Sequence, residues 1–134
     1  MNLRFGMAAV AGACAISVAA ASAQAPQKTT NDGVYTAAQA ERGKKAFSAS
    51  CTTCHDTDRF SGATFTDAWA GKPMKEIWDV ASGTMPEDNP GSLKQQEYAD
   101  ILAYFLSLNA FPAGDAELAP GAGPMANIKI EKKK

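Results

Sequence analysis

Two cysteines and the chain's only histidine lie within five consecutive positions, in the segment CTTCH formed by Cys51, Cys54, His55 and the two threonines between the cysteines. Cysteines at this spacing can form a local disulfide, contribute to a zinc site, act as a redox-active pair or attach a covalent cofactor. Each of these chemistries needs different partners elsewhere in the chain. The rest of the sequence therefore decides which of them is favoured.

The N-terminus has the pattern of a secretory signal peptide over residues 1–23. Asn2–Arg4 form a short positive region, Met7–Ala20 are almost uncharged and apolar, and Ala21-Ser22-Ala23 offers a small-x-small cleavage pattern. The apolar run is short for a membrane span. We therefore expect cleavage, periplasmic export, removal of Cys14 and no stable membrane insertion, with an uncleaved anchor as the alternative.

Three of the four chemistries find little support. A zinc site built from four cysteines, or from two cysteines and two histidines, needs more of these residues than the mature chain would contain. A thioredoxin-like pair should follow a strand, whereas Cys51 follows a segment with a helical pattern. A disulfide between Cys51 and Cys54 would close a very short loop and constrain the unfolded chain only weakly.

The fourth chemistry, covalent haem attachment, gives every position a role, because C-x-x-C-H is the c-type attachment motif. The two thiols add to the vinyl groups on one edge of the porphyrin, and the spacing of the cysteines matches that of the vinyls. The adjacent imidazole is then held over the ring face, where it can bind iron. We predict one haem c attached through Cys51 and Cys54, with His55 as an iron ligand.

The remaining chain is divided by composition into a linker, one domain and a tail. Residues 24–33 are polar and rich in helix breakers, residues 34–110 carry helical patterns, and residues 111–134 are rich in Ala, Gly and Pro with a basic end. We expect the tail to lack a core of its own. A domain this small has a marginal core, and small scaffolds usually need a staple such as a large cofactor.

Three helices are predicted within the domain. The first is expected to begin after Thr36 and the last after Ser92, since each is followed three residues later by Gln, as in a capping box. Pro73 suits the first turn of a short middle helix, and Gly83 suits the position just after its end. Residues 55–71 have no sustained period and are expected to form a loop with at most one helical turn.

Several of these features together resemble the class I monohaem c-type cytochromes over residues 34–110. They are CTTCH at the end of a first helix, Met85-Pro86 in a later loop, and the C-terminal helix EYADILAYFLSLN. Gly43 and Phe47 match the family's glycine and aromatic positions in the first helix, and Tyr104 falls where an aromatic crosses near that glycine. The resemblance implies an all-α cytochrome c fold, with short helices and long loops around one haem.

The second axial position of the iron separates an electron carrier from a catalyst or gas binder. A second histidine does not exist in the chain, Met74 begins a predicted helix, and Met125 lies in the tail. Met85 lies in a non-helical loop, and Gly-Thr-Met-Pro resembles the family's ligand loop. We therefore expect Met85 to be the second ligand, which would raise the reduction potential and suit a carrier.

Other residues are expected to contact the haem. Arg59 and Trp69 are candidates to pair or hydrogen-bond with the propionates, with packing at the haem edge as the alternative for Trp69. His55 should donate its free ring N–H to a backbone carbonyl, which we place near Phe60–Gly62. The residues expected to line the apolar pocket are Ile77, Val80, Leu102 and Phe105.

We expect a protein that carries one electron between larger redox proteins, with a donor dehydrogenase or membrane oxidoreductase and an acceptor oxidase, and with no catalytic residue. The segment FPAGDAEL after the last helix favours, loosely, a quinoprotein dehydrogenase as donor. One alternative is a haem-based ligand sensor or peroxidase-like enzyme with Met85 not bound, and another is a tethered subunit of a larger complex. With 13 basic and 14 acidic residues, the chain has no nucleic-acid footprint.

Overall fold

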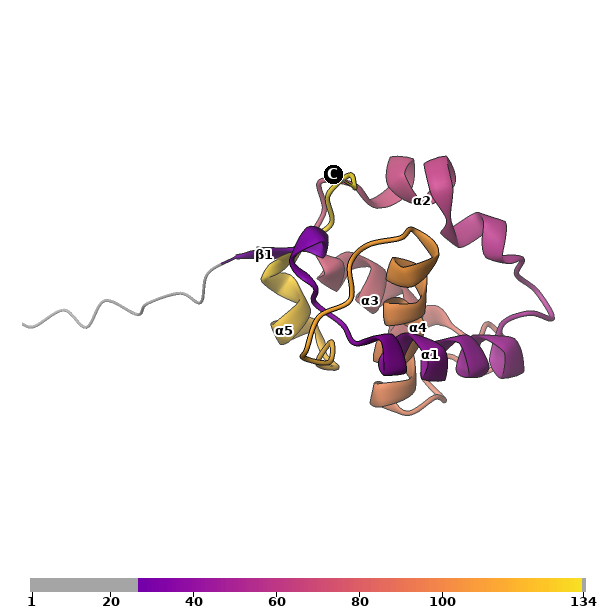
Figure 1. The fold of residues 1–134 in the computed structure, drawn as a ribbon. Coiled ribbons are helices and arrows are strands. Elements are labelled where there is room, and N and C mark those ends of the chain that lie inside the picture. The colour runs from indigo at the N-terminus through magenta and orange to yellow at the C-terminus, as the bar shows by residue number, and fades with distance from the viewer. Residues whose placement is uncertain (1–26, 134) are drawn as a thin grey trace, which may run out of the picture.

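The computed structural model describes residues 27–133, so the predicted signal peptide lies outside the described residues (Figure 1). The structure is mostly helical, which confirms the all-α prediction. Its helices are α1 (Ala37–Ser50), α2 (Gly62–Trp69), α3 (Met74–Thr84), α4 (Gln95–Leu108) and α5 (Ala122–Ala126), with 3-10 turns η1 (Thr30–Asp32) and η2 (Thr57–Phe60), and with strands β1 (Lys28–Thr29) and β2 (Ile128–Lys129). No helix in the described range is long and apolar enough to cross a membrane.

Helix α1 packs directly against α4 (Figure 1). The side chain of Thr36 accepts a hydrogen bond from the backbone N–H of Gln39, at 3.1 Å, which confirms the predicted start of α1. A Cβ atom added at Gly43 would overlap the backbone carbonyl of Asp100, so only a glycine permits this approach of the two backbones. Phe47 then packs on Phe105 at a centroid distance of 5.6 Å.

Helix α4 begins later than the sequence indicates. The predicted cap, Ser92, lies in the preceding turn, where its backbone N–H donates to the carbonyl of Asn89. Lys94 is the N-cap residue, and its backbone N–H donates to the carboxylate of Glu97 at 2.9 Å. The prediction of Ser92 as the cap is therefore wrong, because the helix begins two residues later and the Glu97 carboxylate accepts the backbone N–H of the actual N-cap, Lys94.

Residues 55–71 are more helical than expected, since they contain both η2 and α2. Helix α2 has only eight residues, and Phe65 is its one buried side chain, so the segment is too short and too exposed to show a helical period. Pro73 is the N-cap of α3 and lies just before the first turn in which it was expected, and the helix extends through Gly83 to Thr84. The expectation that Gly83 lies just after the end of α3 is therefore wrong, because Gly83 belongs to its last turn.

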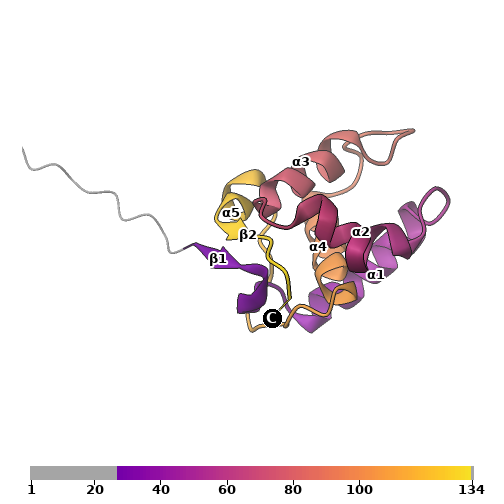
Figure 2. The same cartoon turned by 90° about the horizontal axis from the view of Figure 1, so that it is seen from above.

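The two terminal segments pair with each other and with the helical body. Strands β1 and β2 are parallel, and Lys28 lies opposite Ile128 (Figure 2). The tail has no separate core, but its apolar side chains join the core of the domain. Those buried to 8% exposure or less are Phe111, Leu118, Met125, Ile128 and Ile130.

The CTTCH segment and the loop after α3 lie at the end of the molecule away from β1 and β2 (Figure 2). CTTCH follows the last turn of α1, and the loop that carries Met85 follows α3. The α1–α4 packing and the terminal strands thus leave the two predicted ligand segments together at one end.

Candidate functional site

The CTTCH segment forms a tight turn at the end of α1. Cys51 is the C-cap residue of α1, and its backbone N–H donates to the carbonyl of Phe47 at 2.8 Å. The carbonyl of Cys51 in turn accepts from the N–H of Cys54 at 3.1 Å and from that of His55 at 2.9 Å. The backbone therefore fixes the two cysteines and the histidine relative to one another.

Both thiols are free in the structure. Cys54 is exposed, whereas Cys51 is half-buried and packs against the core. Burial raises the pKa of the Cys51 thiol, and the neighbouring Cys54 raises that pKa further. The absence of a bond between these two described cysteines leaves each sulfur able to form a thioether.

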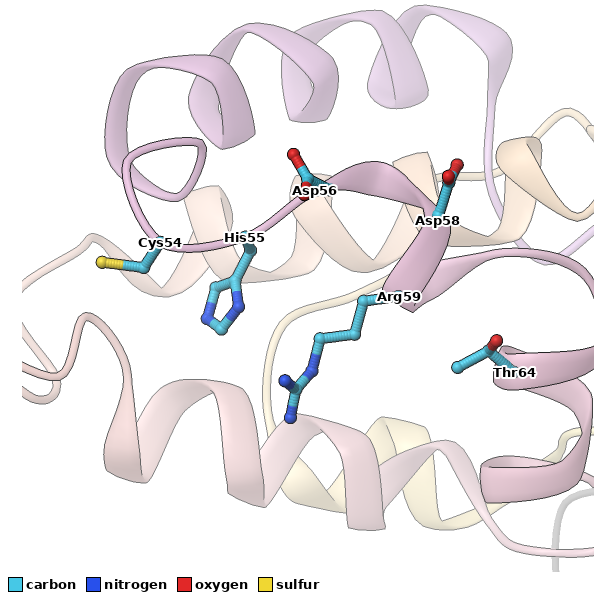
Figure 3. Close-up of a pocket in the computed structure, with 6 residues that line it drawn as sticks. All are labelled: Cys54, His55, Asp56, Asp58, Arg59 and Thr64. Atoms are coloured by element: carbon cyan, nitrogen blue, oxygen red, sulfur yellow. The ribbon is translucent and has the colours of Figure 1, made fainter.

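A pocket of about 450 Å³ opens beside this turn (Figure 3). It is lined by Cys54, His55, Asp56, Asp58, Arg59 and Thr64. The His55 ring and the Arg59 guanidinium point to the side of the ribbon away from α1, while the carboxylates of Asp56 and Asp58 point to the other side (Figure 3). The structure thus brings three predicted site residues, Cys54, His55 and Arg59, to one pocket.

The His55 ring contacts the ring of Phe60 edge-on, with centroids 5.5 Å apart and planes at 84°. A hydrogen bond from His55 was expected near the carbonyl of Phe60. That carbonyl instead accepts a hydrogen bond from the side-chain amide of Asn109, at 2.9 Å. Within residues 27–133 the His55 ring forms no hydrogen bond. The expected hydrogen bond is therefore not formed, and an aromatic contact lies in its place.

Met85 lies at the C-cap of α3 and is half-buried. Its N–H donates to the carbonyl of Ala81 at 3.2 Å, and its carbonyl accepts from the Tyr98 hydroxyl at 2.6 Å and from the N–H of Gly91 at 3.1 Å. The peptide bond to Pro86 is cis. Met85 does not line the His55 pocket, but its backbone is fixed on three sides.

Trp69 also lies outside the lining of the His55 pocket. It ends α2, is half-buried, and has the ammonium of Lys72 at 5.2 Å from its ring centroid. Ile77, Leu102 and Phe105 are buried, but Val80 is 47% exposed. The contacts of Trp69 and Arg59 with a haem stay predictions.

The donor set and the nearby surface fit a covalently attached haem. Two free thiols and an imidazole are fixed on one turn, and the exposed Val80 lies one helical turn before the Met85 loop, as apolar surface that a flat cofactor could cover. No group of three or more Cys, His, Asp or Glu residues in the described range could hold a bare metal ion. A redox-active pair in a βαβ setting is likewise not supported, since Cys51 follows a helix.

Sequence reasoning missed two residues that fix the ligand segments, Tyr98 and Asn109, and it missed the aromatic contact of Phe60 with His55. A buried tyrosine hydroxyl usually has a hydrogen-bond partner, which for Tyr98 is the carbonyl of Met85. Asn109 is the C-cap residue of α4. Nothing in the sequence indicates which distant loop its amide contacts.

The family model described as cytochrome C oxidase, cbb3-type, subunit III matches residues 38–105, which is just over half of the chain. The matched range runs from the first turn of α1 to α4 and includes the CTTCH turn and Met85. No curated protein and no solved structure matches the chain.

Proposed function

Because the chain belongs to the family of cytochrome c oxidase, cbb3-type, subunit III, we propose that it carries single electrons between larger redox proteins in the periplasm, on a haem iron held by His55 and Met85. Family membership by itself shows three properties of the chain. The chain is a monohaem c-type cytochrome domain, it has one covalent haem c on its cysteine pair, and its role is electron transfer.

The observation that carries the proposal is the fixed backbone of Met85, which lies on a different element from the CTTCH turn but at the same end of the molecule. The haem, when bound, supplies a one-electron iron couple. Cys51 and Cys54 would hold it, and the thioether of Met85 would favour the reduced iron and so raise the reduction potential. With His55 and Met85 as the ligands in both oxidation states, little would need to rearrange when an electron is gained or lost.

Arg59 is proposed to pair with a haem propionate. Its guanidinium points into the pocket that His55 also lines (Figure 3), and the ion pairs found among the described residues do not include it. Trp69 is proposed to lie against the haem edge. The cation of Lys72 over its ring holds Trp69 near the α2–α3 junction.

The proposed electron donor is either a quinoprotein dehydrogenase or a membrane oxidoreductase. The proposed electron acceptor is an oxidase. The family description names an oxidase subunit, which supports an oxidase as acceptor. The signal-like sequence of residues 1–23 supports export to the periplasm.

The test measures the absorption spectrum and the reduction potential of three haem-loaded proteins: the wild type, Met85→Ala and Met74→Leu. Met85→Ala should lose the methionine–iron charge-transfer band, bind CO rapidly when reduced, and have a lower potential. Met74→Leu is the matched control, because Met74 is a buried core residue at the start of α3 and leucine conserves its volume. Rapid CO binding by the wild type, without that band, would instead support the ligand-binding alternative.

A second candidate function is that of a fixed subunit in an oxidase complex, which the family description favours. Fractionation of cells that produce the full chain separates the two functions. Recovery only in membranes, together with a haem-containing oxidase, supports the fixed subunit. Recovery as a free protein that reduces and reoxidises with added partners supports the carrier.

A further inference from the structure

The segment after His55 is tied to the far end of α4 by one side chain, that of Asn109. The Asn109 amide nitrogen donates to the carbonyl of Phe60 at 2.9 Å and to that of Phe105 at 2.7 Å, and its amide oxygen accepts the N–H of Gly62 at 2.9 Å. Gly62 has a φ of 61°, a left-handed conformation that glycine adopts readily. Asn109 therefore fixes the backbone on both sides of residue 61.

This tie also fixes the Phe60 ring. The ring stacks on Phe105, with centroids 4.3 Å apart and planes at 6°, and meets Phe47 edge-on at 5.5 Å. It also contacts the His55 ring edge-on. The Phe60 ring thus lies between the core formed by α1 and α4 and the imidazole.

From these contacts we propose that Asn109 is a positioning residue that sets the plane of the His55 ring through Phe60. The torsion that rotates a histidine ring about its Cβ–Cγ bond has broad minima, so the ring plane needs a restraint from outside the residue. Metal-binding histidines usually receive it from a hydrogen bond to the second ring nitrogen. Here the described residues supply an aromatic contact instead, and Asn109 holds that aromatic in place.

The inference rests on the proposed role of His55 as an iron ligand. In an oxidised low-spin haem, the plane of the axial imidazole influences how the unpaired spin is distributed over the ring. The anisotropy of the electron paramagnetic resonance signal and the pattern of haem methyl shifts in the proton magnetic resonance spectrum depend on this plane together with the orientation of the second axial ligand. A residue with a merely structural role would change the unfolding temperature and leave both spectra as they are.

The experiment compares the oxidised haem-loaded wild type with Asn109→Ala, Phe60→Leu and the double variant. Both single variants should alter the methyl-shift pattern and the resonance anisotropy in the same direction. The double variant should change them no further than Phe60→Leu does, because Asn109 acts through Phe60. Phe60→Leu leaves the backbone bonds of Asn109 in place, which keeps the test valid if Asn109→Ala folds poorly.

Ser107→Ala is the matched control, since the Ser107 hydroxyl lies in the same last turn of α4 but donates its hydrogen bond to the carbonyl of Tyr104, at 2.9 Å, and not to the 60–62 segment. It should leave both spectra unchanged. The inference would be overturned if the spectra of Phe60→Leu were the same as those of the wild type. It would also be overturned if Ser107→Ala changed the spectra as much as Asn109→Ala does. Loss of the proposed function is recognised separately, because the wild type itself would then lack the charge-transfer band of Met85.

Discussion

The Tyr98 hydroxyl lies 2.6 Å from the carbonyl oxygen of Met85, and it also accepts the N–H of Leu93 at 3.4 Å. Tyr98 is 2% exposed, and its ring meets that of Trp78 edge-on. One phenol group on α4 therefore holds both ends of the loop that carries the proposed ligand. At the scale of the residue, the position of Met85 depends on Tyr98 as much as on its own neighbours in the chain.

We predict that Tyr98→Phe weakens the Met85–iron bond without unfolding the protein. The variant removes one hydrogen bond to the Met85 carbonyl, a loss on the order of 1 kcal/mol, while the bond from Gly91 is retained. The charge-transfer band should disappear at a lower temperature than in the wild type. Absorption recorded during heating of the oxidised protein measures this.

The control for this prediction is Tyr104→Phe. Tyr104 lies on the same helix and is 9% exposed, and its hydroxyl has no hydrogen-bond partner in residues 27–133. It should keep the band to the same temperature as the wild type. An equal loss in the two variants would show that the Tyr98 hydroxyl is not responsible.

At the scale of the elements, the contact of α1 with α4 determines where the CTTCH turn lies. Gly43 is buried at this contact, where its Cα faces the backbone of Asp100 and Ile101. Because α1 ends directly at Cys51, any displacement of α1 also displaces the cysteines.

Gly43→Ala should therefore be strongly destabilising, although alanine is the better helix former. Its methyl group would overlap backbone atoms that cannot rotate away, and we expect a loss of about 3 kcal/mol or more in the free energy of unfolding. Denaturant unfolding monitored by circular dichroism measures it.

Gly83→Ala is the matched control, since Gly83 lies in the last turn of α3 with open space around the added Cβ. It should be neutral or slightly stabilising, by up to about 1 kcal/mol. If Gly43→Ala were equally tolerated, the two helices would not be in backbone contact at this position.

At the scale of the whole molecule, one ion pair network joins α1, α4 and the tail. The Arg42 guanidinium donates to both oxygens of Asp100, at 2.9 and 3.1 Å, and lies 2.9 Å from the Glu117 carboxylate. Burial by itself would raise the pKa of Asp100, but hydrogen bonds from Arg42, Gln96 and Gln39 outweigh it and lower that pKa below its ordinary value.

The sign of the pH dependence follows from this lowered pKa. The charged Asp100 stabilises the fold above the pKa of an unfolded aspartate, about 3.9, and this contribution is lost as the pH falls through the lower folded value. Asp100→Asn should be less stable by on the order of 2 kcal/mol at neutral pH, and the difference from the wild type should shrink as the solution is acidified. Unfolding curves at a series of pH values measure it.

Asp79→Asn serves as the control for the network, because Asp79 is exposed and pairs with Lys75 one turn away on the same helix. Removing an exposed pair of this kind should cost less than about 1 kcal/mol. A difference between Asp100→Asn and the wild type that stays constant down to strongly acidic pH would contradict the assigned pKa.

Much of the site could be predicted from the sequence because its chemistry is local. The haem attachment needs only the spacing of two cysteines and one histidine, and the family match confirms that interpretation. The start of α1 was equally predictable, since Thr36 caps it from within the same turn. The role of Met85 stays a prediction, based on elimination and on its loop.

The tertiary structure alone decided the features that depend on residues far apart in the chain. Asn109 contacts Phe60 across 49 positions, Gln39 exchanges two hydrogen bonds with the backbone of Leu118, and the terminal strands pair although each has two residues. None of these contacts has a local pattern, because a side-chain amide or a two-residue strand can pair with many partners until packing brings one of them close. The sequence by itself determined that the chain binds a covalent haem. The packing of its helices and termini determined how the residues proposed to bind that haem are fixed in place.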